Sequence, residues 1–381
     1  MDCLKIAFWN ANGLAQHTLE VKSFLKTNQV EIFLISETHF TEKSHFYIPQ
    51  YKFYHAMHPD ETAHGGSAIL IKNTIKHHKG ILFRSNELQA TNIIVEDWHG
   101  PVSISSVYSP QKHNIKKDKY KEFFKTLGHR FLACGDYNAK HTVWGSRLIT
   151  TKGRQLYSAI KDLSLNVTFP DSPTYWPTDL NKIPDLIDFC VSKGMPPKFQ
   201  KCESCFDLSS DHSPVILHIK HNFSNIEQPC KLHTKKTDWN RYRFLISENL
   251  VTQLPLKTYE NISDAVEHLV NTIQQSAWNS TPQYSYANIP KCSIEIRNKI
   301  SEKRKARKRW QTTKSPGDKT ILNKLTAELK MLLKDERDKK FESDMQNVDC
   351  TKSTDFSLWK ITNKVKQQHK VNHPVRKTDN N

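Results

Sequence analysis

Short apolar runs recur along residues 1–220 and alternate with segments in which the apolar residues are three or four positions apart. Runs such as 32–36 and 131–135 are almost continuously apolar, which is typical of strands in a sheet that is covered on both faces. The segments between them have the periodicity of amphipathic helices. This alternation predicts a layered α/β domain.

We predict the individual elements from these two patterns. Strands are expected at residues 4–9, 32–36, 67–72, 91–96, 102–108, 131–135, 186–192 and 213–220. Helices are expected at residues 18–28, 116–127 and 153–163. Each helical segment has an apolar face, so it can cover one face of a sheet.

The composition of the sequence changes after Lys220, where the apolar runs stop and Lys, Glu, Gln and Asn become frequent. We place the boundary of the first domain near residue 221. A partly helical linker is expected over 222–290 and a basic helical region over 291–381. Amphipathic helices punctuated by prolines are predicted here at residues 239–250, 262–278, 293–312 and 319–345.

The chain carries a formal net charge of +17, and most of the excess lies after residue 221. Residues 222–381 contain 30 Lys and Arg against 18 Asp and Glu, whereas residues 1–221 contain 26 against 21. Such an excess favours a polyanionic partner, because each cation placed near a phosphate releases condensed counterions. The densest run, KRKARKR at 303–309, is typical of a solvated helix face, a nucleic-acid contact or a nuclear import signal.

Membrane insertion and secretion are not predicted. The chain has no run of about 18 apolar residues, and its first residues lack a basic stretch followed by a long apolar block. Its eight cysteines are scattered, without the density of a disulfide scaffold. These features favour reduced thiols in an intracellular compartment.

Polar residues gather at the ends of predicted strands in four segments, which read WNANGL, SET, GDYN and SSDHSP. They lie at residues 9–14, 36–38, 135–138 and 209–214. Taken singly, each has a structural explanation, since Asn or Asp beside Gly is typical of a turn and Ser-Asp-His can cap a strand or helix. Their order along the chain is more informative.

In that order, the segments resemble the endonuclease/exonuclease/phosphatase superfamily, which includes DNase I and the abasic-site endonucleases. The resemblance covers residues 3–220 and rests on the strand-end residues Asn10, Glu37, Tyr108, Asp136, Asn138, Asp188, Asp211 and His212. It implies a four-layer α/β sandwich of the DNase I-like type, followed here by a basic helical arm. It also implies a metal-dependent phosphodiesterase.

The resemblance assigns Glu37 as the main ligand of Mg²⁺, for which Mn²⁺ can substitute, with Asn12 and Asp211 beside the metal. Oxygen donors of this kind suit a hard cation. Tyr108 and Asn10 would contact phosphate oxygens. Abasic-site endonucleases have Asp where this chain has Asn12, so we expect altered metal affinity and little repair activity.

Hydrolysis of a phosphodiester requires an activated water and stabilisation of the developing charge. The resemblance implies that Asp136 orients or deprotonates the water, helped by Asn138. His212 would hydrogen-bond the scissile phosphate. Asp188 would hold the tautomer of His212, as the aspartate of a catalytic triad does.

Further sequence motifs indicate one branch of the superfamily. The segments WNANGL, SETHF, HGGSAILIK, VYSP, GDYNAKHTVWGS and SPTYWP look like the endonuclease domain of jockey-type non-LTR retrotransposon polyproteins. This likeness implies nicking of DNA at a target site in the nucleus, with element RNA as a further partner. Thr174 would help to position the DNA. The basic run would contact nucleic acid through Lys303, Arg304, Lys305, Arg307, Lys308 and Arg309.

In those polyproteins a basic helical linker and a reverse transcriptase follow the endonuclease, and residues 294–340 look like that linker. Polymerase catalysis needs paired aspartates, and the chain has no Asp-Asp dipeptide. We therefore expect a truncated element or a fragment of a longer reading frame, without reverse transcription. Two alternatives stay open: a lipid or inositol phosphodiesterase of the same fold, and a catalytically inactive nucleic-acid-binding protein derived from a transposon.

Overall fold

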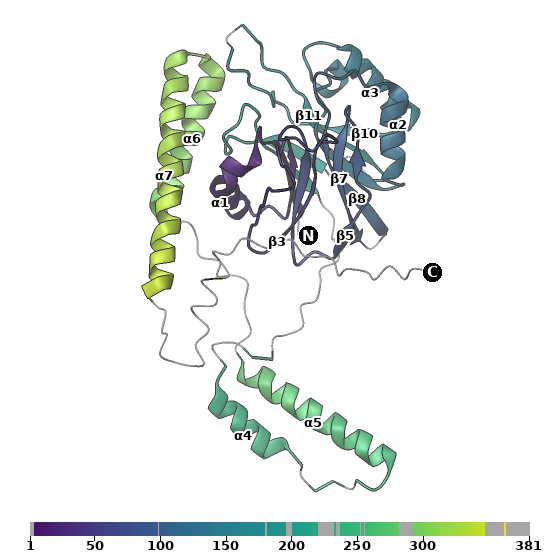
Figure 1. The fold of residues 1–381 in the computed structure, drawn as a ribbon, viewed down its shortest axis with the longest axis vertical. Coiled ribbons are helices and arrows are strands. Elements are labelled where there is room, and N and C mark those ends of the chain that lie inside the picture. Colours follow the sequence, from purple (N-terminus) through teal and green to yellow (C-terminus); the bar gives the residue numbers. More distant parts are fainter. Residues whose placement is uncertain are drawn as a thin grey trace, which may run out of the picture. The chain divides into compact units, whose positions relative to one another are not determined.

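The computed structural model describes residues 4–97, 99–179, 181–195, 200–219, 232–233, 237–251, 253–254, 256–281, 293–346 and 362 (Figure 1). The chain divides into two compact units. The first unit combines Met1–Asn225 with Cys292–Asn381, and the second is Ile226–Lys291. Each unit is described by itself.

The first unit contains a six-stranded sheet that joins the two ends of the sandwich sequence. Its strand order is β12 (Gln200–Ser204), β13 (Val215–Ile219), β1 (Leu4–Asn10), β2 (Ile32–Ser36), β4 (Ser67–Lys72) and β3 (Tyr51–Ala56). β1 and β2 are parallel, whereas the other neighbours are antiparallel. The pairing of β1 with β13 brings residues more than 200 positions apart into one sheet.

A second sheet is formed by the middle of the sequence. Its strand order is β10 (Asn166–Thr168), β11 (Asp188–Lys193), β9 (Phe131–Asp136), β8 (Gly100–Tyr108), β7 (Gln89–Asp97) and β5 (His77–Lys79), and β6 (Phe83–Arg84) also pairs with β7. β8 and β9 are parallel, which places the carboxyl ends of both strands at the same edge.

An apolar core joins the inner faces of the two sheets. It contains Phe8 and Leu34 from the first sheet and Ile104 and Leu132 from the second, all fully buried. Alternate residues of these strands point to the opposite faces, because successive side chains of a strand alternate. Those outer faces need covering by helices.

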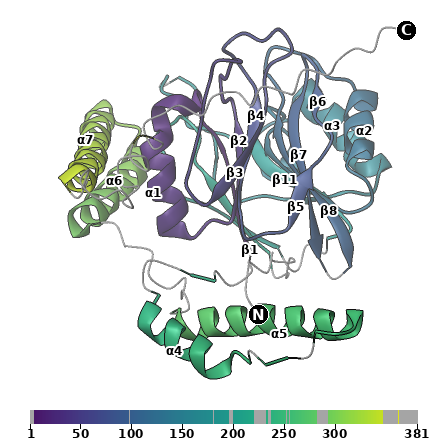
Figure 2. The same cartoon turned by 60° about the horizontal axis from the view of Figure 1, so that its bottom comes forward.

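Helices cover both outer faces (Figure 2). α1 (Thr18–Asn28) packs on the first sheet, where Phe24 and Phe33 share an apolar cluster. α2 (Lys117–Thr126) and α3 (Thr151–Asp162) pack on the second sheet. Short 3₁₀ helices occupy Leu14–His17 and Thr142–Trp144. The four-layer sandwich predicted from the sequence is therefore confirmed.

The sequence patterns located the central strands better than the edge strands. The predicted strands at 32–36 and 67–72 have the predicted bounds, and the others differ by a few residues at their ends. β3, β12 and the short strands β5, β6 and β10 were not predicted. β3 reads YKFYHA and is mostly half-buried, so its apolar pattern is weak.

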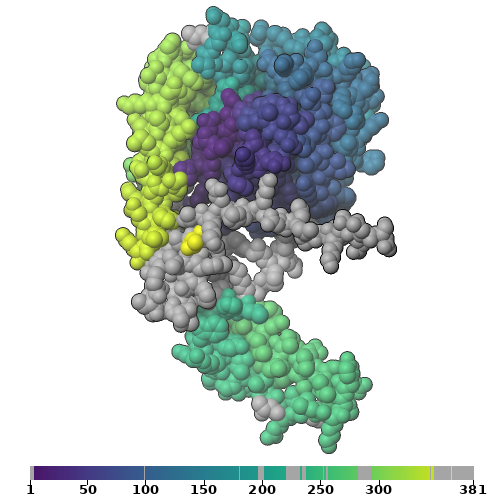
Figure 3. All heavy atoms as spheres, in the orientation of Figure 1, coloured from purple at the N-terminus to yellow at the C-terminus, as the bar shows by residue number. Residues whose placement is uncertain are grey.

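Two helices that follow the sandwich in sequence form a hairpin on α1. These are α6 (Ile294–Thr313) and α7 (Pro316–Gln346), and a shared apolar cluster with Leu19 of α1 packed against it holds them there. The cluster is formed by Ile296, Leu329 and Leu333. In Figure 3 the yellow-green atoms of this hairpin lie against the purple atoms of the first residues. The helical part of the basic region is confirmed for residues 294–313 and 316–346, and its docking on the sandwich was not predicted.

The second unit contains α4 (Trp239–Asn249) and α5 (Tyr259–Ser280), as the periodicity of the sequence predicted. The Asp238 carboxylate caps α4 by accepting hydrogen bonds from two main-chain N–H groups at its start. The boundary predicted near residue 221 falls outside the described residues and stays a prediction. None of the helices in the described part of the chain is long and apolar enough to cross a membrane.

Candidate active site

The sheets bring the polar strand ends together. β1 ends at Asn10, β9 ends at Asp136, and β11 begins at Asp188. The register of the second sheet pairs Asp136 with Tyr108 on one side and with Asp188 on the other. The Asn10 amide crosses from the first sheet and donates to the Asp136 carboxylate at 2.8 Å. One edge of the sandwich thus carries polar groups from both sheets.

Asp136 lies at the centre of this edge and is 1% exposed. Its carboxylate also accepts hydrogen bonds from the main-chain and side-chain nitrogens of Asn138, at 2.8 and 2.9 Å. Burial, followed by the negative charge of Asp188, raises the pKa of Asp136 to about 8. The group can therefore change its protonation state near neutral pH.

His212 and Asp188 form a buried pair. The Nδ1 atom of His212 lies 2.8 Å from a carboxylate oxygen of Asp188, and both residues are at most 5% exposed. Burial alone would lower the pKa of His212, but the Asp188 carboxylate raises it to about 10. The imidazole is therefore protonated at neutral pH. Thr174 holds Asp188 in place, because its hydroxyl oxygen accepts a hydrogen bond from the Asp188 N–H at 3.1 Å.

Glu37 follows β2 and points toward the same groups. Burial alone would raise its pKa, but hydrogen bonds from His39, Asn10 and Tyr108 bring it below its ordinary value. The backbone of Glu37 has a φ of 51°, and Asn12 and Asn138 have φ values of 44° and 46°. Asparagine tolerates this left-handed region, whereas glutamate is strained there. Such strain is typical of a residue held in place for function.

Two carboxylate oxygens at this edge are buried without a hydrogen-bond partner among the described residues. They are Oδ1 of Asp188 and Oδ1 of Asp211. Buried carboxylate oxygens normally have partners, so an unpaired one is suited to bind a cation. The donor set of Glu37, Asp211 and Asn12 consists of oxygens and fits a hard divalent cation.

Two other groups of side chains in the described residues lie close enough to share an ion. The ligand atoms of Asp136, Asp188 and His212 lie within 4.8 Å of one another, and so do those of His58, Asp60 and His64. In the first group, Nδ1 of His212 is already engaged by Asp188 at 2.8 Å.

The predicted nucleic-acid contacts lie in contrasting environments. Thr174 is fully buried and bonds to main-chain groups, so it can act only through the segment that it holds. Lys303 and Arg307 are buried, and their charged groups are bonded to Glu20 and to loop carbonyls, so neither is free to contact a phosphate. Arg304 is partly exposed and pairs with Asp207 at 2.6 Å. The remaining cations of the run are exposed: Lys305, Lys308 and Arg309.

Two serines that support the site were not predicted as functional. The Ser36 hydroxyl donates to the main-chain oxygen of Val107 at 2.9 Å and ties the two sheets together beside Asp136. The Ser210 hydroxyl donates to the main-chain oxygen of Asn10 at 2.8 Å. Both serines lie inside the recognised SET and SSDHSP segments, so their position in the sequence was a usable signal.

Lys152 was also missed. Its ammonium group is buried and donates to the main-chain oxygens of Ser109 and Pro110 at 2.9 and 2.8 Å. Burial lowers the pKa of Lys152 to about 8, although Asp136 opposes this shift. No local pattern marks this lysine, since an isolated Lys at the start of a helix is usually solvated.

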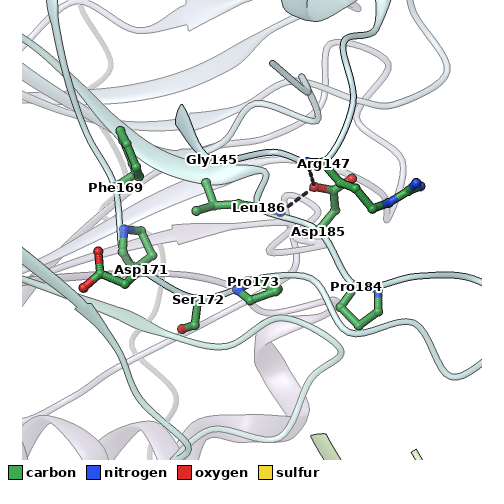
Figure 4. A pocket seen from close by; sticks show the side chains of 10 residues that line it. Gly145, Arg147, Phe169, Asp171, Ser172, Pro173, Pro184, Asp185 and Leu186 are labelled. Carbon is green, nitrogen blue, oxygen red and sulfur yellow. Dashed lines mark hydrogen bonds between the residues drawn. The ribbon is translucent and has the colours of Figure 1, made fainter. Parts of the chain in front are cut away.

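A cavity of about 320 Å³ lies next to the segment that contains Thr174 (Figure 4). Its walls come from residues 169–173 and 184–186, together with Gly145 and Arg147. The Asp185 carboxylate accepts hydrogen bonds from the main-chain N–H groups of Arg147 and Leu186, at 2.9 and 3.0 Å. These bonds keep the walls of the cavity in a defined arrangement.

The sequence is similar to proteins of mobile elements. The profile of the endonuclease/exonuclease/phosphatase family matches residues 7–212. The chain is 28% identical over 381 residues to the Drosophila melanogaster protein named "Probable RNA-directed DNA polymerase from transposon BS", covering 99% of this chain and 42% of that protein. It is 25% identical to the RNA-directed DNA polymerase from mobile element jockey of Drosophila funebris, and the match covers 98% of this chain and 41% of that protein. The chain thus spans about two fifths of the length of these curated relatives.

Solved structures with a similar arrangement include the endonuclease domain of TRAS1, a telomere-specific non-LTR retrotransposon. That structure has a TM-score of 0.48 and 19% identity, and it covers 57% of this chain and 98% of its own. The AP endonuclease LMAP from Leishmania major has a TM-score of 0.47 and 11% identity, and the match covers 58% of this chain and 88% of that one.

Proposed function

The chain belongs to the endonuclease/exonuclease/phosphatase family, and on that premise we propose that it is a divalent-metal-dependent nuclease that nicks DNA. One observation carries this proposal. The buried His212–Asp188 pair lies beside Asp136, so a charged donor and a titratable carboxylate occupy one site. Hydrolysis of a phosphodiester needs an activated water and stabilisation of the developing charge, and these two groups can supply them.

The role that we assign to His212 follows from its charge. With Nδ1 engaged by Asp188, the protonated ring can present Nε2–H to a non-bridging oxygen of the phosphate. A fixed positive donor in a buried site stabilises the negative charge that develops during attack. Asp188 keeps the ring oriented and compensates its charge.

We assign activation of the attacking water to Asp136. Its raised pKa makes it a stronger base than an ordinary carboxylate. Asn10 and Asn138 fix the orientation of its two oxygens. Burial, followed by the Glu37 charge, keeps the pKa of Tyr108 far above its ordinary value, so the Tyr108 hydroxyl stays protonated and can donate to a phosphate oxygen.

We propose that Glu37, Asp211 and Asn12 hold Mg²⁺, for which Mn²⁺ can substitute. The unpaired Oδ1 of Asp211 and the oxygen-rich donor set support this assignment. When bound, the metal ion supplies Lewis-acid stabilisation of phosphate charge. Replacing a carboxylate with the neutral Asn12 amide would weaken the hold on the ion.

The proposed substrate is duplex DNA, because the matched family is one of endonucleases, exonucleases and phosphatases and the relatives are proteins of mobile elements. We propose phosphate contacts from the exposed Lys305, Lys308 and Arg309, and a DNA-positioning role for the segment around Thr174. Action in the nucleus and binding of element RNA are further proposals that follow from the same likeness.

Incubating the full chain with supercoiled plasmid tests this function. Mg²⁺ should convert the plasmid to open circles, and EDTA should stop the reaction. Asp188→Asn, which removes the charge facing His212 with little change in shape, is the control for contaminating nucleases. The proposal would be refuted if nicking persisted in EDTA. It would also be refuted if the Asp188→Asn variant nicked the plasmid at the wild-type rate.

A further inference from the structure

Helix α6 lies against the loop that leads into Asp211 and His212. Lys303, Arg307 and Gln311 are four residues apart, so their side chains share one face of the helix. All three contact this loop or the residue that follows it. One helix face therefore holds a continuous stretch of backbone next to the candidate active site.

Arg307 makes the contacts nearest to His212. Its guanidinium donates to the main-chain oxygens of Leu208, Ser210 and His212, the last two at 3.1 and 3.0 Å. The His212 oxygen also accepts a hydrogen bond from the Trp9 indole at 3.2 Å. The main chain of His212 is thus held by the first sheet on one side and by α6 on the other.

Lys303 holds the start of the same loop. Its ammonium group pairs with the Glu20 carboxylate of α1 and donates to the Ser209 hydroxyl at 2.7 Å. Ser209 in turn donates to Glu20 at 2.7 Å. Buried charges are tolerated only when they are paired and hydrogen-bonded, so this network specifies one arrangement of helix and loop.

We propose that Arg307 is a positioning residue for His212, and that the face of α6 formed by Lys303, Arg307 and Gln311 supports the active site. The inference rests on the proposed function. A planar guanidinium can bond several carbonyl oxygens at once, whereas a lysine ammonium cannot reproduce that geometry. By fixing the carbonyl of His212, Arg307 keeps the imidazole facing Asp188 and the reacting phosphate.

The test uses the full chain and measures kcat and KM for plasmid nicking in Mg²⁺. Arg307→Ala and Arg307→Lys are compared with Arg297→Ala, which removes an exposed arginine from the same helix. Both Arg307 variants should lower kcat by about tenfold or more, while KM stays within about twofold, because a misplaced His212 loses a contact that is strongest in the transition state. Arg297→Ala should match the wild type within about twofold.

Chemical rescue separates positioning from general packing. Guanidinium ion at low concentration should restore part of the kcat of Arg307→Ala, since it supplies the lost donors, and it should not accelerate Arg297→Ala. Thermal melting checks that each variant is folded. If Arg307→Ala does not fold, Arg307→Lys provides the test, because it keeps a cation in the buried position and should fold. A lowered kcat with an unchanged KM in this variant supports the positioning role.

Two results would overturn the inference: wild-type kcat in a folded Arg307 variant, or a loss in folded Arg307→Ala that guanidinium does not reverse. An inactive wild-type chain would overturn the proposed function instead, so the two failures are distinguishable.

Discussion

The basic run at 303–309 has two faces that share a composition and differ in environment. We name Lys303 and Arg307 the inner face, and Lys305, Lys308 and Arg309 the outer face. The inner face is buried and bonds to the loop before His212, whereas the outer face is exposed. The difference teaches that the charge of a helical segment does not reveal what each cation contacts.

The physical reason lies in the cost of burial. A buried ammonium or guanidinium must have anionic or carbonyl partners, and Glu20 with the loop carbonyls provides them. On the outer face, Arg309 pairs with Asp318 at 2.9 Å and is still 72% exposed, so its guanidinium remains in contact with solvent. The inner face should therefore affect folding and catalysis, and the outer face should affect binding.

The largest expected effect sets the scale for this comparison. Replacing His212 or Glu37 with Ala should lower the single-turnover nicking rate by at least about a hundredfold, because each group acts mainly on the transition state. Gel quantification of nicked plasmid measures the rate, and circular dichroism checks folding. A near-normal rate in folded His212→Ala would remove the basis for giving the inner face a catalytic role.

The next effect concerns stability. Lys303→Ala leaves the buried Glu20 carboxylate without its cation and should destabilise the first unit by about 3–5 kcal/mol. The double variant Glu20→Gln with Lys303→Met should recover much of this loss. Lys305→Ala, on the outer face, should change stability by no more than about 0.5 kcal/mol. Urea unfolding followed by tryptophan fluorescence measures all three, and equal losses on both faces would break the comparison.

DNA binding should depend on the outer face and not on the inner face. Replacing Lys305, Lys308 and Arg309 with Gln should reduce the slope of log affinity against log salt by about two to three units, at about 0.9 per lost phosphate contact. Fluorescence anisotropy with duplex DNA measures the slope. The matched control makes the same change at Lys330, Lys334 and Lys340 of α7, which are exposed as well. An equal reduction in the control would assign the effect to net charge.

The smallest effect is a pH dependence of the inner face. Burial alone would raise the pKa of Glu20, but Lys303 and neighbouring donors lower it from 4.5 to about 2. A depressed carboxylate pKa contributes stability that is present above pH 4.5 and is lost as the pH falls toward about 2. The difference in Tm between the wild type and the Glu20→Gln, Lys303→Met variant should therefore shrink in acid. A difference in Tm that does not change with pH would contradict a stabilising ion pair between Glu20 and Lys303.

Local patterns in the sequence were sufficient for the central layers and for the strand ends. β2 and β4 read as apolar runs because both of their faces are buried, and α1 has the periodicity of a one-sided helix. Asn10, Asp136 and His212 could be placed near one another because they adjoin strand ends, and sheet pairing brings such ends to one edge.

The edge strand β3 and the buried Lys152 had no such signal. A half-buried strand lacks a clear apolar alternation, and a lysine becomes buried only through the carbonyls that receive it.

The sequence by itself determined that residues 303–309 are helical and strongly basic, since propensity and charge are local properties. Only the tertiary structure decided which cations are inside. The partner of Lys303 is Glu20, 283 positions earlier in the chain, and the partners of Arg307 are main-chain oxygens that every residue carries. Because a carbonyl oxygen leaves no mark in the sequence, the role of the inner face became visible only once α6 was docked.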